Sequence, residues 1–280
     1  MKKSGVMGWP VAHSLSPALH GYWLKLHGVD GSYERMEVPP DNLGTALHAL
    51  AAKGFAGCNL TIPHKETALP LMESLDPAAK RVGAVNTVVV GPDGSLAGYN
   101  TDGYGFIESL RAGIPGWNAA SGPALVLGAG GAARAILDAL IQDGSLEIRL
   151  ANRHRARAEE LADIFGNKIK VLEWEKRTTG LSGTGLLVNA TSLGMEKNPP
   201  LELTLDALPP DAAVCDIVYA PLETPLLRAA KARGLRTVDG LGMLLHQARP
   251  AFQLWFGVLP EVTPELRRAV LDARDARAAP

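Results

Sequence analysis

The chain has 280 residues, 46% of them hydrophobic, which is enough for two domains with separate cores at roughly 100 to 200 residues per domain. Lys and Arg number 28 against 29 Asp and Glu, so the net charge of -1 excludes the strong basic field that a nucleic-acid partner needs.

The sequence also argues against export and against a membrane location. Residues 1–10 contain no apolar stretch of signal-peptide length, and no later segment reaches the ~18 apolar residues of a membrane span. Cys58 and Cys215 stand far apart without CxxC spacing, as expected for reduced thiols in the cytoplasm. The seven histidines form no HExxH pattern, so we expect no metal dependence.

The first region of the chain alternates short apolar runs with helical stretches, which predicts a parallel or mostly parallel α/β sheet. A helix is expected to begin with Ser16 as its N-cap and Pro17 at the first helical position. Strands are expected at 4–7, 33–38, 57–60, 87–90 and 96–99, the last two paired across a turn at 92–94.

A break rich in Gly and Pro at 113–123 precedes the second region. There the apolar runs predict a six-stranded doubly wound sheet of Rossmann type, with strands at 124–127, 147–150, 170–172, 185–189, 213–217 and 236–238. From Gly240 the pattern is helical again, and we expect the last ten residues to fray. We place one α/β domain at 1–103, with helices at 241–280 packing back on it, and a second domain at 104–240. Two domains predict a cleft between them.

A glycine-rich turn follows the strand at 124–127 and opens a helix, which is the setting that a dinucleotide site requires. Gly128 would allow the tight turn, Gly130 would let the backbone approach a pyrophosphate, and Ala133 would permit close helix packing. The free N–H groups at the helix start would bind the anion. Ala129, Gly131 and Ala132 complete this predicted cofactor loop.

The choice of cofactor is read at the end of the next strand. Enzymes that use NAD place an Asp or Glu there, but this chain has Asn152 followed by Arg153, His154, Arg155 and, two residues later, Arg157. Arg153 and Arg157 are four apart at an expected helix start, so they are predicted to face the same way and to clamp a 2'-phosphate. NADP is therefore favoured over NAD.

Lys65 and Asp102 are the candidate catalytic residues. Each follows a predicted strand, and ligands of α/β sheets bind at the carboxyl ends of the strands. With a redox cofactor, a lysine that supplies and removes a proton and a carboxylate that orients it suggest an alcohol/ketone dehydrogenase. The alternative is that the two are separate surface charges.

The chain resembles the shikimate dehydrogenase family over essentially its whole length. The motifs that carry the resemblance are Ser14-Leu15-Ser16-Pro17, Asn59-Leu60-Thr61-Ile62-Pro63-His64-Lys65, Gly83-Ala84-Val85-Asn86-Thr87, Asn100-Thr101-Asp102-Gly103, the glycine loop at 128–132, Asn189-Ala190-Thr191-Ser192-Leu193-Gly194-Met195, and Gly240-Leu241-Gly242-Met243 with Gln247. Seven motifs in the family order make this resemblance specific.

The resemblance implies reversible NADPH-dependent reduction of 3-dehydroshikimate to shikimate, a step towards the aromatic amino acids. It implies that Lys65 is the acid/base with Asp102 as its partner, and that residues 1–103 bind substrate while 104–240 bind NADP. The substrate-binding residues that it implies are Ser14, Ser16, Asn59, Thr61, Asn86, Tyr219 and Gln247. Thr191, Ile217 and Gly240 would line the nicotinamide side. The chain departs from the family at His154, where Thr is usual.

Two other functions are weighed against this one. A quinate/shikimate dehydrogenase with relaxed substrate choice and NAD preference is the nearer, and Arg153 and Arg157 argue against it. A nonenzymatic NADP-sensing protein would require the proton-transfer pair to be lost, but both members are present. The expected partners are small molecules only, and the sequence is compatible with a monomer or a homodimer.

Overall fold

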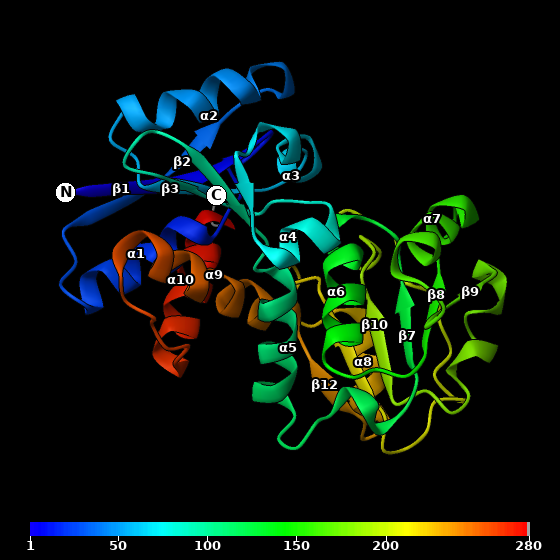
Figure 1. Ribbon diagram of the computed structural model, residues 1–280. Helices are drawn as coiled ribbons and strands as arrows, with labels where there is room; N and C mark the ends of the chain where they lie inside the picture. The colour runs from blue at the N-terminus through cyan, green and yellow to red at the C-terminus, as the bar shows by residue number, and fades with distance from the viewer. Residues whose placement is uncertain (279–280) are drawn as a thin grey trace. The chain divides into compact units, whose positions relative to one another are not determined.

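The computed structural model describes residues 1–278, and the chain forms two compact units (Figure 1). The first comprises Met1–Thr101 with Gln247–Pro280, and the second comprises Asp102–His246. The domain junctions expected from the sequence lay after residues 103 and 240, whereas the chain passes between the units after Thr101 and after His246. The second passage lies inside helix α9 (Gly240–Phe256).

The first unit contains a six-stranded sheet in the order β2-β1-β3-β5-β6-β4. The strands are β1 (Lys2–Gly8), β2 (Gly31–Glu37), β3 (Gly57–Leu60), β4 (Ser74–Leu75), β5 (Thr87–Val90) and β6 (Leu96–Tyr99). Strands β2, β1 and β3 are parallel, and β5 and β6 pair antiparallel across the predicted turn. Only β5 runs against its neighbours β3 and β6, and β4 is parallel to β6, so five of the six strands run the same way and the expectation of a mostly parallel sheet is confirmed. Strand β4 was not predicted, since two residues show no periodicity.

Helices cover both faces of this sheet (Figure 1). They are α1 (Ser16–Leu26), α2 (Leu43–Ala52), α3 (His64–Thr67), α4 (Pro77–Val82), the second half of α9, and α10 (Pro264–Ala278). Helix α2 packs Leu43, Leu47 and Leu50 into the core on one face, while α1 and α10 lie on the other face. Helix α10 continues to Ala278 and so includes most of the segment that is expected to fray, and 279–280 lie outside the described residues.

Helix α1 begins differently from the prediction. Ser16 is its first helical residue and Leu15 holds the N-cap position, without a side-chain capping bond. The hydroxyl that serves the helix start belongs to Ser14, whose Oγ accepts from the Ser16 backbone N–H at 3.3 Å. The prediction of Ser16 as N-cap was therefore wrong by one residue, and Pro17 occupies the second helical position.

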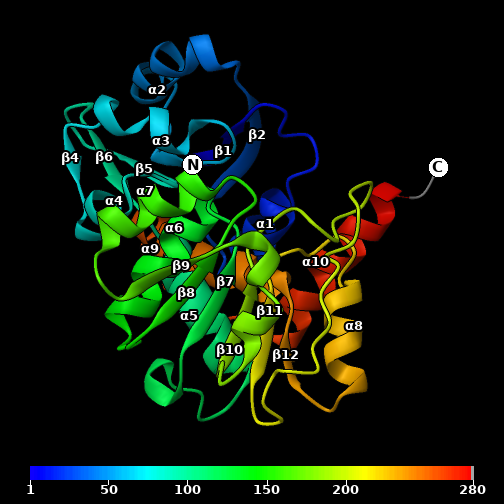
Figure 2. The same ribbon diagram turned by 90° about the vertical axis from the view of Figure 1, so that its right-hand side faces the viewer.

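The second unit has the predicted doubly wound parallel sheet, in the order β12-β11-β10-β7-β8-β9 (Figure 2). Its strands are β7 (Ala124–Leu127), β8 (Ile148–Ala151), β9 (Ile169–Leu172), β10 (Leu186–Asn189), β11 (Ala213–Asp216) and β12 (Arg236–Val238). Its helices are α5 (Asp102–Gly113), α6 (Gly131–Gln142), α7 (Arg155–Phe165), α8 (Pro225–Ala232) and the start of α9. Within β7, Val126 packs in the core shared with α5, α6 and α7, whereas Leu125 and Leu127 pack in the core shared with α8.

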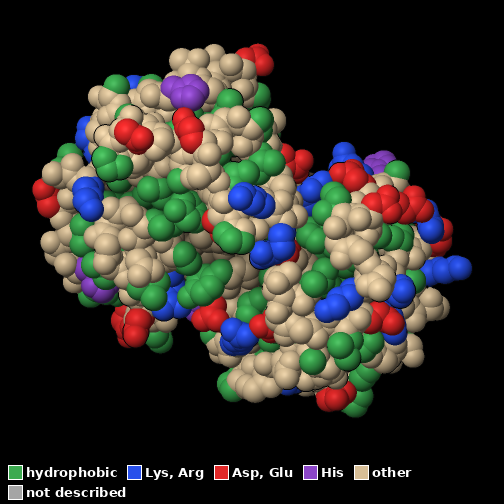
Figure 3. Space-filling model, viewed as in Figure 1, with side chains coloured by type: hydrophobic (Ala, Val, Ile, Leu, Met, Phe, Trp, Pro, Cys, Tyr) green, Lys and Arg blue, Asp and Glu red, His purple; other side chains and the backbone are tan. Residues whose placement is uncertain are grey.

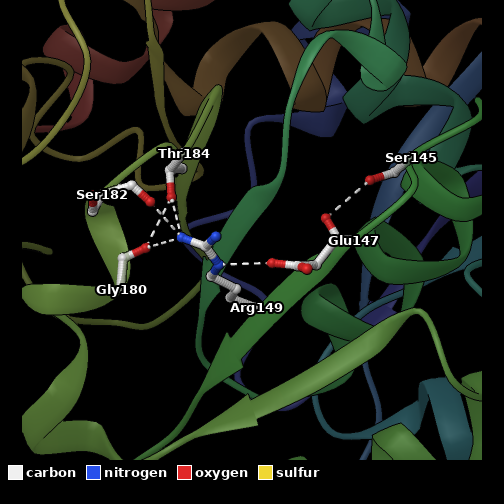
Figure 4. Close-up of polar contacts among 6 residues, drawn as sticks. All are labelled: Ser145, Glu147, Arg149, Gly180, Ser182 and Thr184. Carbon is white, nitrogen blue, oxygen red and sulfur yellow. Dashed lines mark hydrogen bonds and ion pairs between the residues drawn. The ribbon is translucent and has the colours of Figure 1, made fainter.

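The guanidinium group of Arg149 on β8 has a structural role in this unit (Figure 4). Its Nε donates to the Glu147 carboxylate at 2.8 Å, and its Nη1 donates to the carbonyls of Gly180 and Ser182 at 2.8 and 2.6 Å. The charge is paired with an acid, and the carbonyl contacts tie β8 to the segment that precedes β10.

The surface shows no large field of one sign on the face drawn in Figure 3, where basic and acidic side chains are interspersed. Among residues 1–278, no helix has the length and apolar character needed to cross a bilayer.

His20 of α1 lies completely buried in an aromatic cluster of the first unit. Its ring stacks on Tyr33 at a centroid distance of 4.0 Å and an interplanar angle of 3°, and Trp23, Phe252 and Trp255 surround it. Neither ring nitrogen has a hydrogen-bond partner among the described residues. Burial lowers the pKa of His20 to about 3, so the ring is neutral in the folded protein.

We therefore predict that His20→Phe flattens the pH dependence of stability. Below pH 6.5 the unfolded chain takes up a proton on His20 that the folded chain refuses, so wild-type stability falls as the pH decreases. Between pH 7 and pH 5 this group accounts for a loss of about 2 kcal/mol in the free energy of unfolding. Urea titrations at the two pH values measure it, and an equal loss in wild type and His20→Phe would contradict the assignment.

Candidate active site

The carboxyl ends of β7 and β10 approach each other closely at Gly128. This glycine has φ +108°, a conformation that L side chains rarely adopt. A Cβ added to it would lie 2.8 Å from the Ala190 carbonyl oxygen and 3.0 Å from the Thr191 Cγ2. Glycine is thus required both by the backbone and by the close packing of the two loops.

The ends of β11 and β12 meet in the same way at Gly240, where a Cβ would lie 2.1 Å from the carbonyl oxygen of Ile217. The sheet order makes β12, β11, β10 and β7 consecutive neighbours. The three residues predicted to line the nicotinamide side, Thr191, Ile217 and Gly240, therefore follow three adjacent strands at one edge of the second unit.

A buried polar network holds these strand ends, and the sequence analysis missed it. Asp216 Oδ1 accepts from Asn189 Nδ2 and from the Val218 N–H, both at 3.0 Å, and its Oδ2 accepts from Thr224 Oγ1 at 2.6 Å. Asn189 Oδ1 in turn accepts from Thr191 Oγ1 at 2.7 Å. Burial raises the pKa of Asp216. The available signal was that Asn189 and Asp216 each end an otherwise apolar strand.

The predicted pyrophosphate site lies at the start of α6, a helix of 12 residues with Gly130 as its N-cap. No side chain caps this end. A Cβ added to Gly130 would meet nothing within 4 Å, so packing inside the protein does not demand glycine here. Open space in front of free N–H groups at a helix N-terminus suits a phosphate group of a dinucleotide. The flanking residues Ala129, Gly131 and Ala132 are half-buried.

The arginines after β8 differ from the prediction in their local structure. Helix α7 starts at Arg155, so Arg153 precedes the helix and does not share a helical face with Arg157. Asn152 Nδ2 donates to the His154 carbonyl at 2.9 Å and shapes this turn. Arg155 is ion-paired with Glu159 and Glu173, whereas Arg153 and Arg157 are exposed and pair with no carboxylate of the described residues.

Lys65 lies in the first turn of α3, a helix that is anchored by its neighbour His64. The buried His64 ring donates from Nε2 to the Val38 carbonyl at 2.8 Å. The Lys65 carbonyl accepts from the Val85 N–H at 2.8 Å, next to Asn86 in the chain. Lys65 is half-buried.

Asn86 connects this region to the segment that leads to Asp102. Its Oδ1 accepts from the Thr101 N–H at 2.9 Å, and Asp102 follows directly as the buried first residue of α5. Its Nδ2 donates to Thr101 Oγ1 at 2.9 Å and to Gln247 Oε1 at 3.3 Å. The main chains that carry Lys65 and Thr101 are therefore both hydrogen-bonded to the pair Val85-Asn86.

Asn59 extends the same network to β2. Its Nδ2 donates to the Asn86 carbonyl at 3.1 Å and to Thr87 Oγ1 at 3.0 Å. Its Oδ1 accepts from the Tyr33 hydroxyl at 2.7 Å. Burial raises the pKa of Tyr33 well above its usual value, so the phenol stays protonated. Tyr33 was not among the predicted site residues, and no sequence pattern on β2 indicates it.

The first unit thus joins three of the predicted substrate residues, Asn59, Asn86 and Gln247, in one hydrogen-bond network. Asn59 is hydrogen-bonded to Asn86, and Asn86 to Gln247, while Ser14 and Ser16 are linked to each other at the start of α1. Thr61 follows β3, and its N–H donates to the Met7 carbonyl at 2.9 Å. This cluster of neutral donors and acceptors suits a polyhydroxylated ligand.

Tyr219, the remaining predicted substrate residue, belongs to the second unit and follows β11. Burial raises the pKa of Tyr219, so its hydroxyl stays protonated and can donate to an anion. Among residues 1–278, no three His, Cys, Asp or Glu side chains are arranged to hold a metal ion.

Three stretches of the chain match known families. Residues 6–88 match the family described as shikimate dehydrogenase substrate binding domain. Residues 115–196 match the family described as shikimate / quinate 5-dehydrogenase, and residues 240–271 match the shikimate 5'-dehydrogenase C-terminal domain.

Curated relatives match along nearly the whole chain. A protein of Paramagnetospirillum magneticum named shikimate dehydrogenase (NADP(+)) is 55% identical over 268 residues, which cover 96% of this chain and 97% of that protein. A protein of Rhodospirillum rubrum with the same name is 56% identical over 272 residues, which cover 96% of each.

Solved structures are similar over the same length. The shikimate 5-dehydrogenase of Thermus thermophilus, solved with NADP(H) and shikimate, is 44% identical with a TM-score of 0.87, and the match covers 98% of this chain and all of that one. The quinate dehydrogenase of Corynebacterium glutamicum, solved with NAD, is 33% identical with a TM-score of 0.90, and the match covers 97% of this chain and 99% of that one.

We predict that Asp216→Ala lowers the free energy of unfolding by about 3 kcal/mol, because it leaves three buried donors without their acceptor. Urea-induced unfolding measures this loss. Asp211→Ala, which removes an exposed carboxylate shortly before the same strand, is the control and should change stability by less than about 0.5 kcal/mol. Equal effects of the two substitutions would show that the buried network does not stabilise these strand ends.

Proposed function

The chain belongs to the shikimate dehydrogenase family, as its motifs predicted, and we propose that it catalyses the reversible NADPH-dependent reduction of 3-dehydroshikimate to shikimate. The protein is then an alcohol/ketone oxidoreductase of aromatic amino-acid biosynthesis. The observation that supports the proposal is the hydrogen-bond network centred on Asn86, which joins Asn59, Gln247 and the main chain of Thr101 next to the segment of Lys65.

In the proposed reaction Lys65 donates a proton to the ketone oxygen as it becomes an alcohol, and it removes that proton in the reverse direction. Asp102 orients the ammonium group and accepts a hydrogen bond from a neighbouring substrate hydroxyl. The neutral side chains of Asn59, Thr61, Asn86 and Gln247 bind the ring hydroxyls, which they can do without adding net charge. Ser14, Ser16 and Tyr219 donate hydroxyl hydrogens to the substrate carboxylate.

NADP, when bound, supplies or accepts the hydride. The N-terminus of α6 with Gly128, Gly130 and the residues between and after them would hold its pyrophosphate, and the space in front of Gly130 fits that group. Arg153 and Arg157 would bind the 2'-phosphate, assisted by Asn152, which shapes their turn. Thr191, Ile217 and Gly240 would line the nicotinamide side.

A cytoplasmic location and small-molecule partners fit this reaction, and we include both in the proposal. The alternative is a quinate/shikimate dehydrogenase that prefers NAD, and a quinate dehydrogenase solved with NAD is similar in structure to this chain. The pair of exposed arginines after β8 favours NADP instead, since NAD lacks the 2'-phosphate that they would bind.

Wild-type protein is therefore expected to oxidise shikimate faster with NADP than with NAD, followed by absorbance of the reduced nicotinamide. Arg153→Ala should raise the KM for NADP about tenfold or more and barely change that for NAD, because a charge-assisted hydrogen bond to phosphate is lost. Arg155→Ala is the control, because Glu159 and Glu173 already hold that guanidinium. Equal or better turnover with NAD would reject the NADP assignment.

Lys65→Ala is expected to lower kcat by about 10²-fold or more while the affinity for shikimate changes far less, as for loss of a positioned acid/base. Turnover and equilibrium binding of shikimate measure the two quantities. Lys53→Ala, which removes an exposed lysine of the same unit, should leave both at wild-type values. A Lys65→Ala variant that turns over at the wild-type rate would refute the assigned role.

A further inference from the structure

Two arginines converge on the main chain of Ser14 in the first unit. Arg35 Nη2 donates to the Ser14 carbonyl oxygen at 2.8 Å, and Arg277 Nη1 donates to the same oxygen at 2.8 Å. Arg35 lies on β2, and Arg277 lies in the last turn of α10. Residues 242 positions apart in the chain thus bring two positive charges to one atom.

This arrangement is electrostatically unfavourable as it stands. No carboxylate of the described residues forms an ion pair with either guanidinium, and Arg35 Nε is buried without a hydrogen-bond partner. Burial and then the Arg277 charge lower the pKa of Arg35. Arg149, whose guanidinium also binds carbonyls, differs because Glu147 neutralises it (Figure 4). A single neutral carbonyl does not offset two like charges, whereas an anion beside them would.

The residue that the two arginines hold also offers a donor to an anion. Ser14 Oγ accepts from the Ser16 N–H, which leaves the Ser14 O–H hydrogen available to donate outward. Helix α1 begins two residues later, so its N-terminal N–H groups add positive potential at the same place. The Ser14 hydroxyl, the start of α1 and the two guanidinium groups that bind the Ser14 carbonyl are therefore all located at or next to Ser14.

We propose that Arg35 and Arg277 determine selectivity for a negatively charged substrate by stabilising the substrate carboxylate bound at Ser14. The inference rests on the proposed function, since it concerns the carboxylate of shikimate. Arg35 also positions Ser14, because it holds the carbonyl of the residue whose hydroxyl binds the anion. Arg35 and Arg277 thus distinguish ligands by their charge and not by the structure of their ring.

The test compares shikimate with its uncharged methyl ester in wild type and in Arg35→Gln. The wild-type ratio of kcat/KM for acid over ester should fall about five- to tenfold in Arg35→Gln, because only the acid loses a charge interaction. Arg35→Lys keeps the charge and should restore most of the ratio even if it weakens both substrates. Arg277→Gln should lower the ratio about two- to threefold, since that side chain is exposed and screened.

Arg268→Gln is the matched control, because it removes the same charge from an exposed position of α10 and should leave the ratio unchanged. An equal loss for acid and ester in Arg35→Gln, or no loss for either, would overturn the proposal in favour of a purely structural role. Thermal unfolding of each variant checks that the fold is retained, and Arg277→Gln tests the proposal independently of β2.

The outcomes also separate this inference from the proposed function. Wild-type turnover of shikimate with an unchanged acid-to-ester ratio in Arg35→Gln and Arg277→Gln would refute the arginine pair and leave the function standing. If calorimetry shows that wild type binds shikimate more tightly than the ester but does not turn it over, and if Arg35→Gln loses this preference, the role of the two arginines would be supported and the proposed function refuted. Failure of wild type to bind shikimate would refute both.

Discussion

The hydrogen bonds of Asn86 are the interaction on which the candidate active site of the first unit depends. The backbone N–H of Thr101 and the carbonyl of Asn86 itself can each play only one role, so they fix which atoms of Asn86 and Asn59 face them. The two amide side chains are then oriented by backbone groups that can only donate or only accept a hydrogen bond. Since buried amides without partners are costly, this set of polar groups is stable in one arrangement.

The second unit uses the same physical device with a charged centre. Asp216 gathers three donors from β10, from the loop after β11 and from the residue that caps α8, and Asn189 passes the constraint on to Thr191. Gly128 packs directly against the main chain of Ala190, and Gly240 against that of Ile217. This close packing restricts the conformational freedom of the strand ends. A cofactor that binds at this edge meets a surface that is already formed.

The sequence predicted the second unit better than the first for a physical reason. Parallel strands that are buried on both faces have continuous apolar sequences, so β7, β10 and β11 could be predicted, whereas the two residues of β4 in the first unit show no periodicity and were missed. Errors at Ser16 and Arg153 were shifts of one or two residues at helix starts, where several short polar residues suit the cap equally. The roles of Tyr33 and Arg35 could not be predicted from the sequence, because their hydrogen-bond partners lie 26 and 21 residues away in the chain.

Substrate choice in this fold must rest on individual side chains, since the solved shikimate and quinate dehydrogenases match the same backbone with TM-scores of 0.87 and 0.90. Both substrates carry a carboxylate, so the Arg35 and Arg277 pair cannot separate them. Discrimination then falls to the neutral groups. Both Asn59 amide hydrogens are committed to Asn86 and Thr87, which leaves only its oxygen to meet a ligand. Tyr33 already donates to that oxygen, so Asn59 can accept one further hydrogen bond and donate none. If Asn59 binds substrate as proposed, the ligand must present a hydroxyl hydrogen to its oxygen, and the direction of that hydrogen bond contributes to selectivity.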